Sequence, residues 1–136
     1  MDKVKRFFSV LVLLTLGFGA LSAQTDFHKA ASKLKPAKYY KNIHVKKLFS
    51  DAKASGFVIW IKEKVPLHKH ARHSETVYIL RGKGDMRLGE RLLKVKKGDI
   101  IFIPEGSPHS VRVTRGVLKV ISIQAPEFKG KDRIML

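Results

Sequence analysis

The sequence contains no cysteine, and this absence excludes three kinds of feature at once. Disulfide bonds, thiolate metal ligands and cysteine nucleophiles all require that residue. Acidic residues are scarce as well: the chain has 11 aspartates and glutamates and 28 lysines and arginines, which gives a formal charge of +17 at pH 7. A charge this positive favours anionic partners. The chain also shows no helical repeat, internal duplication or linker.

The first 23 residues have the pattern of a secretory signal peptide. Three basic residues come first, an apolar run follows over residues 7–21, and small residues end at Ala23. This run is shorter than the about 20 apolar residues that cross a bilayer. We therefore expect export to the periplasm or the extracellular space with cleavage after Ala23; the alternative is an uncleaved N-terminal anchor. Cleavage would leave one domain of 113 residues with a formal charge of +15, since residues 1–23 carry three basic residues and one acidic residue.

The remaining chain divides by pattern into an arm, a β-rich region and a tail. Residues 24–42 are rich in lysine without a clear period, which indicates a basic arm that is loose or only partly ordered. Residues 43–124 contain short β-like runs separated by glycine-containing turns, a pattern typical of a sandwich or barrel. The expected runs cover residues 43–49, 57–63, 76–81, 91–95, 100–103, 109–114 and 117–124. Residues 125–136 form a polar tail whose apolar end is expected to pack on the barrel or on a second subunit.

Two stretches of the β-rich region contain three histidines and a glutamate at regular spacing. The first reads H-x-H-x4-E-x6-G from His68 to Gly82, and the second reads G-x5-P-x-G-x2-H from Gly98 to His109. His68 and His70 are two positions apart, so on a strand they project from the same face, about 7 Å apart along the backbone. Imidazole nitrogens and a carboxylate suit first-row metals such as Mn, Fe, Co, Ni, Cu and Zn. The residues therefore predict a metal-binding β protein.

This pair of motifs resembles the signature of the cupin superfamily, and the strand pattern extends the resemblance over residues 43–124. The resemblance implies an all-β fold, a cupin-like jelly-roll β-barrel forming a single domain after the signal peptide. It also implies a divalent transition metal (Mn, Fe, Ni, Cu or Zn), whose expected ligands are His68, His70, Glu75 and His109.

Glycine and proline in the two motifs are expected to shape turns. Three glycines are expected at tight turns or with positive φ: Gly82, Gly98 and Gly106. Pro104 is expected to start the turn that delivers His109. His73 has no place in the motifs and is expected to be exposed, with a substitute ligand or a group at the rim of the site as the alternative.

The two-residue period of a strand predicts which side chains face the site. Inward-facing residues are expected to include Val77, Ile79, Val111 and Val113. The walls would then be mainly valine and isoleucine, while Trp60, Tyr78 and Leu80 face away. No second carboxylate, lysine or tyrosine falls clearly beside the metal as a general base. Any chemistry would therefore run on the metal itself.

Three functions remain open from the sequence. The first is an exported metal-binding protein that holds a small molecule, an anionic one included, in its barrel. The second is a metal-dependent oxygenase or isomerase, because four protein ligands on a six-coordinate metal leave two positions open. The third is an interaction protein that acts through its basic surface. The intact ligand set argues against the third, and the missing acid–base partner favours the first over the second.

The expected macromolecular partners follow from charge and from strand edges. An anionic envelope polymer or lipid surface fits the charge, whereas solubility alone is the alternative explanation. Nucleic acid is not expected, because no motif for it is visible and an exported protein rarely meets it. We expect a homodimer, since edge strands such as residues 43–49 invite pairing and outward aromatic residues need cover; the alternative is a monomer whose edge lysines protect it.

Overall fold

A computed structural model describes residues 28–136 of the chain, so the predicted signal peptide and the start of the arm lie outside the described residues. Residues 28–136 contain no helix with the length and apolar character needed to cross a membrane. The elements are a 3₁₀-helix, η1 (Ala31–Lys33), and the strands β1 (Ile43–Ser50), β2 (Ser55–Ile61), β3 (Lys64–His70), β4 (Ser74–Leu88), β5 (Arg91–Lys96), β6 (Ile100–Ile103), β7 (His109–Ala125) and β8 (Arg133–Met135).

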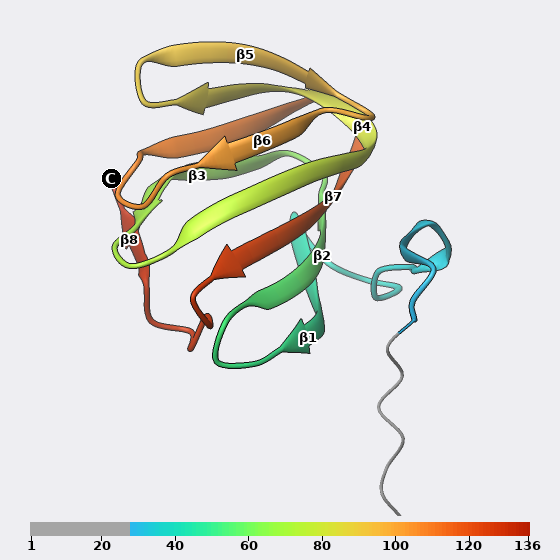
Figure 1. The fold of residues 1–136 in the computed structure, drawn as a ribbon. Coiled ribbons are helices and arrows are strands. Elements are labelled where there is room, and N and C mark those ends of the chain that lie inside the picture. The colour runs from blue at the N-terminus through green and yellow to red at the C-terminus, as the bar shows by residue number, and fades with distance from the viewer. Residues whose placement is uncertain (1–27) are drawn as a thin grey trace, which may run out of the picture.

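The strands form one antiparallel sheet that curls into a half-barrel (Figure 1). The order β1-β2-β7-β3-β8 runs along the sheet, and β4 pairs with β7 while also pairing with β5 and β6. The first part of β7 pairs with β3 and its last part pairs with β2. The predicted all-β fold of the jelly-roll type is confirmed.

The two longest strands continue through glycines that the sequence pattern predicted as turns. β4 crosses Gly82 with register shifts between Ile79 and Gly84, and β7 crosses Gly116 without ending. Both glycines have positive φ, +88° and +69°, so the chain absorbs the irregularity as bulges within a strand. The expected runs 109–114 and 117–124 are therefore two halves of one strand.

Gly82 shows why this irregularity needs a glycine. A Cβ atom there would lie 2.6 Å from the carbonyl oxygen of Val117 on the neighbouring strand. The positive φ expected at Gly98 and Gly106 is also present. Pro104 starts a turn as predicted, because the Ser107 amide donates to its carbonyl oxygen over 3.1 Å.

The last strand was not predicted from the sequence. β8 pairs with β3 of the same chain and places Arg133 opposite His70 and Met135 opposite His68. This pairing joins the backbone of the tail to its own barrel, while the apolar end, Ile134, Met135 and Leu136, stays 43%, 55% and 59% exposed. The run 64–70 was also missing from the expected strands, although its histidines were placed on a strand.

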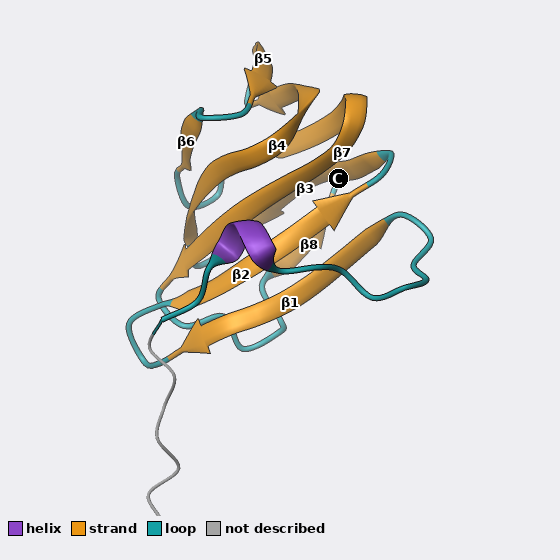
Figure 2. Cartoon of the chain, turned by 90° about the vertical axis from the view of Figure 1, so that its right-hand side faces the viewer, coloured by secondary structure: helices purple, strands orange, loops and turns teal. Residues whose placement is uncertain are grey.

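The arm covers the outer face of β2. Figure 2 shows η1 lying over this strand, and Lys119 Nζ donates to the carbonyl oxygens of Ala31 (2.6 Å), Ser32 (3.2 Å) and Leu34 (2.8 Å). Trp60 projects outward as predicted, yet it is only 1% exposed. Its cover therefore comes from its own chain.

Candidate metal centre

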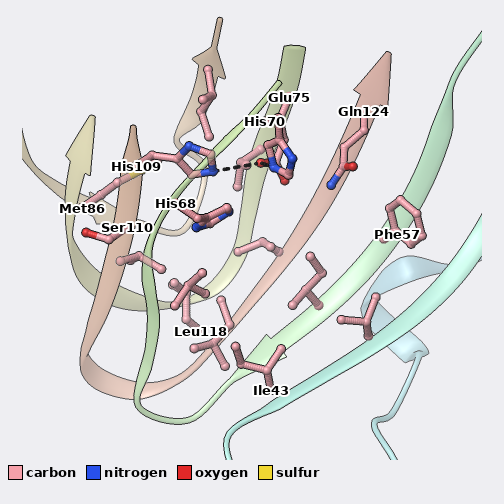
Figure 3. Close-up of a pocket in the computed structure, with 18 of the residues that line it drawn as sticks. Ile43, Phe57, His68, His70, Glu75, Met86, His109, Ser110, Leu118 and Gln124 are labelled. Atoms are coloured by element: carbon pink, nitrogen blue, oxygen red, sulfur yellow. Dashed lines mark ion pairs between the residues drawn. The ribbon is translucent and has the colours of Figure 1, made fainter. Parts of the chain in front are cut away.

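Three histidines converge on one point inside the half-barrel. His68 and His70 come from β3, and His109, the first residue of β7, lies directly opposite His68. One ligand nitrogen from each lies within 4.8 Å of the others, and all three residues are buried. Figure 3 shows these imidazoles gathered beside Glu75, which β4 supplies. The structure thus brings together the four residues expected as ligands.

Backbone carbonyls orient two of the imidazoles. The Nδ1 atom of His68 lies 2.8 Å from the Pro66 oxygen, and Nδ1 of His109 lies 2.9 Å from the Ser107 oxygen. Because a carbonyl only accepts, Nδ1 is the donor in each pair, and Nε2 faces the site. An Arg133 nitrogen lies 3.2 Å from the same His68 Nδ1, but it cannot donate to a nitrogen that already carries a proton. The Nε2 atom of His109 is buried and has no hydrogen-bond partner among the described residues.

Glu75 supplies the negative charge of the site. Its Oε2 atom lies 3.4 Å from Nε2 of both His70 and His109, and its Oε1 atom accepts a hydrogen bond from the Ser122 hydroxyl. Burial alone would raise the pKa of Glu75, but these three contacts hold it below its ordinary value. Burial also lowers the pKa of His68 to about 4. At neutral pH the site therefore offers a charged carboxylate and a neutral His68.

These four residues fit a divalent transition metal. Three imidazoles and one carboxylate match the preference of first-row metals, whereas calcium and magnesium take mostly oxygen ligands. The buried His109 Nε2 atom makes no hydrogen bond with residues 28–136, although Glu75 Oε2 lies 3.4 Å away, and such an atom is one that a metal would satisfy.

An apolar cavity of about 190 Å³ lies beside the four residues. Strand parity correctly predicted that Val77, Ile79 and Val111 line it, whereas Val113, predicted beside them, packs against the core without lining the cavity. The lining residues outside the proposed ligand set that carry polar side chains are Ser110, Gln124 and Arg133. The described lining contains no further carboxylate, lysine or tyrosine.

His73 is buried, which corrects the prediction that it is exposed. Only 5% of the residue is accessible, its Nδ1 atom forms an ion pair with Asp132, and its Nε2 atom donates to the Glu127 oxygen over 2.9 Å. Burial would lower the pKa of His73, but the Glu127 carbonyl and the Asp132 carboxylate outweigh this effect and raise it. His70, His73 and Asp132 also lie close enough to hold a metal, yet a His73 that donates from both nitrogens has no lone pair to offer.

Sequence reasoning missed Asp132, Gln124 and Arg133. Asp132 is 7% exposed, and its Oδ2 atom lies 3.7 Å from Nδ1 of His70. Residues 125–136 have no hydrophobic period and no motif, so nothing in them indicated that two residues would reach the site. The parity of β7 could have indicated Gln124, because Val120, Ser122 and Gln124 share one face.

Comparisons with known proteins agree with this architecture. A family model described as a cupin domain matches residues 57–123. An uncharacterised protein of Aquifex aeolicus is 36% identical over 94 residues, which cover 69% of this chain and 78% of that protein.

Solved structures show the same fold at low sequence identity. An RmlC-like cupin from Shewanella frigidimarina has a TM-score of 0.65 at 16% identity and covers 76% of this chain and 94% of its own. Pac13 of Streptomyces, a nucleoside dehydratase, has a TM-score of 0.63 at 17% identity and covers 76% of this chain and 91% of its own. The matched domain, the curled antiparallel sheet and the histidine cluster lead to one conclusion: the chain belongs to the cupin superfamily.

Proposed function

We propose that this protein binds one divalent transition metal through His68, His70, Glu75 and His109 and holds a small molecule in the adjacent cavity. The observation that supports the proposal most directly is the convergence of three buried imidazoles and a charged carboxylate beside an apolar cavity. A bound metal would supply Lewis acidity and open coordination positions, since four protein ligands do not complete a six-coordinate sphere.

The cavity favours binding over catalysis. Its described ionisable groups are the four proposed ligands and Arg133. Asp132 does not line the cavity and is already paired with His73. Among the described lining residues, no carboxylate or imidazole outside the proposed ligand set is left to move a substrate proton. A metal-dependent oxygenase or isomerase is therefore the alternative, and it would depend on the metal for its chemistry.

Titration with Co²⁺ tests the proposal, because the visible absorption of Co²⁺ reports on its ligands. We expect the metal-free chain to bind about one Co²⁺ and to resist competition by Ca²⁺, which prefers oxygen ligands. Binding of a small molecule in the cavity should shift the visible absorption bands of the bound Co²⁺. A chain that binds no Co²⁺, or loses it to equimolar Ca²⁺, contradicts the proposal. Oxygen uptake that depends on an added compound would favour the enzymatic alternative.

We also propose export and contact with an anionic envelope polymer or lipid surface. The support is the pattern of residues 1–23 and the lysine-rich arm. Mass spectrometry of the product should find a chain that starts at Gln24. Binding to anionic vesicles should weaken steeply as salt approaches physiological strength, where the Debye length is about 8 Å. A product that retains Met1 would contradict the proposed export. Vesicle binding that salt does not change would contradict the proposed contact with an anionic surface.

The proposed homodimer now has a different candidate interface. Trp60 is covered by its own chain, but Tyr78, Ile100 and Phe102 on neighbouring strands β4 and β6 are 42%, 70% and 60% exposed. Within the described chain, β6 pairs only with β4, so its other edge is available to a second copy. Sedimentation equilibrium should give a dimer for the wild type and a monomer for Phe102→Lys. A wild-type monomer across the micromolar range would end this proposal.

A further inference from the structure

Arg133 projects toward the proposed metal ligands from the last strand. It lies opposite His70 in the β3–β8 pair, and directly opposed residues project from the same face of a sheet. The side chain lines the cavity, and one of its terminal nitrogens lies 3.2 Å from Nδ1 of His68. A cation therefore lies at the rim of the cavity, beside the site.

No carboxylate of residues 28–136 lies within ion-pair distance of Arg133. The adjacent Asp132 pairs with His73, and Glu75 faces His70 and His109. A divalent ion beside one carboxylate would keep a positive charge, and Arg133 adds to it. This charge favours an anionic ligand, and a guanidinium matches the geometry of a carboxylate.

The rest of the cavity restricts what such a ligand can carry. Most lining residues are apolar, and each hydroxyl group of a ligand that found no partner there would weaken binding. A sugar or nucleoside, with hydroxyl groups along its whole length, therefore suits this cavity poorly. The volume of about 190 Å³ is somewhat larger than the roughly 150 Å³ that accommodates a benzene molecule.

From these three features we infer that the ligand of the cavity is a small apolar monocarboxylate, recognised by Arg133. Its body, about the size of one aromatic ring or a short branched chain, fills the apolar part, and its carboxylate pairs with the guanidinium at the rim. This inference rests on the proposed function, because it uses the same cavity and the same four ligands. It adds the chemical class of the ligand and the residue that selects it.

Isothermal titration calorimetry with matched acids and alcohols tests the inference. Benzoate and isovalerate are compared with benzyl alcohol and isoamyl alcohol, which have the same carbon skeletons without the charge, and uridine represents a hydroxyl-rich compound. We expect the metal-loaded chain to bind at least one acid about tenfold or more tightly than its alcohol and to bind uridine most weakly. Arg133→Gln should weaken binding of that acid by about tenfold and leave binding of the alcohol unchanged. Arg112→Gln is the matched control, because Arg112 is an exposed arginine that does not line this cavity.

The outcomes separate this inference from the proposed function. If neither acid binds, or if Arg133→Gln binds the acid as tightly as the wild type, the inference is wrong. Metal content is measured on the same samples, and a wild type that takes up no metal contradicts the proposed function instead. In that case the titrations on the metal-free chain decide the role of Arg133: a preference for acids that Arg133→Gln abolishes supports the inference, and a preference that survives overturns it.

Discussion

His73 and Asp132 form a buried ion pair although they lie 59 positions apart in the sequence. The pair joins the turn after β3 to the residue that precedes β8, and the Ala71 amide strengthens the junction by donating to the Asp132 carbonyl over 3.1 Å. The same Asp132 carboxylate lies 3.7 Å from His70 Nδ1. The end of the chain therefore places a carboxylate behind a proposed metal ligand, at a distance longer than a hydrogen bond.

Removing the charge of Asp132 tests what this carboxylate contributes. We expect Asp132→Asn to cost about 3–5 kcal/mol of unfolding free energy, because it leaves a buried His73 without its partner. Co²⁺ affinity should also fall by roughly 10–100-fold, the usual effect of losing a group that orients a metal-bound histidine. Urea unfolding and Co²⁺ titration measure the two effects. The control is Asp85→Asn. The wild-type ion pair between Asp85 and Lys94 is exposed, so its loss should cost less than about 1 kcal/mol of unfolding free energy. Equal stability of the two variants would contradict the role of the buried pair.

Gly82 provides a test of the bulge in β4. Gly82→Ala should destabilise the protein by about 2–4 kcal/mol, since it adds a Cβ atom 2.6 Å from the Val117 oxygen at a φ of +88°. Gly89→Ala is the matched control, because Gly89 also has positive φ, +57°, but no atom within 4 Å of an added Cβ. Its cost should stay near 1 kcal/mol. If urea unfolding shows that both variants lose the same free energy of unfolding, the close approach at Gly82 does not contribute to stability.

The low pKa of His68 predicts how the metal-free protein responds to acid. Burial lowers this pKa to about 4, whereas histidine in an unfolded chain titrates near 6.5. Between these values the unfolded chain binds the proton more tightly, so acidification favours unfolding and stability rises with pH. From about pH 7 to about pH 4.5 the wild type should lose about 2 kcal/mol more than His68→Gln does.

Urea unfolding of both proteins over this pH range measures the difference. His73 acts in the opposite direction, because its pKa is raised and its contribution is present at low pH and lost as pH rises through the folded value. This contribution is common to both proteins, so the comparison cancels it. Parallel curves for wild type and His68→Gln would contradict the assignment to His68.

Lys119 holds the arm against the only tryptophan in the sequence. Its Nζ atom lies 5.4 Å from the centre of the Trp60 ring and donates to three carbonyl oxygens of the arm. Lys119→Met removes these donors, so we expect acrylamide to quench Trp60 fluorescence more strongly and the emission to shift to longer wavelength. Lys94→Met, at a side chain that is 91% exposed, is the control. Unchanged quenching in Lys119→Met would show that the arm covers Trp60 without this lysine.

Features set by local pattern were predicted well from the sequence. The alternation of a strand placed Val77, Ile79 and Val111 in the cavity, since side-chain direction depends only on the two-residue period. The spacing of the two motifs likewise identified the residues that the fold brings together around Glu75.

Features set by long-range pairing were not predictable in this way. Gly82 and Gly116 fit a turn or a bulge equally well by residue type, and only the neighbouring strands decide that both lie within strands. Asp132 and Arg133 reach the site because β8 adds to the edge of β3, a pairing that the tail's own sequence does not indicate. The burial of His73 follows from that same pairing.

Metal content of matched variants tests the central claim most directly. Wild type, His109→Ala and the control His44→Ala are each expressed as the full chain without added residues. They are exposed to the same divalent metals and dialysed, and their metal content is measured by elemental analysis. His44 packs against Trp60, with ring centroids 5.5 Å apart, and does not line the cavity. We predict about one transition metal per chain in the wild type and in His44→Ala, and loss of most of it in a folded His109→Ala that keeps its β circular-dichroism signal. Equal metal content in all three proteins, or none in the wild type, would contradict the account.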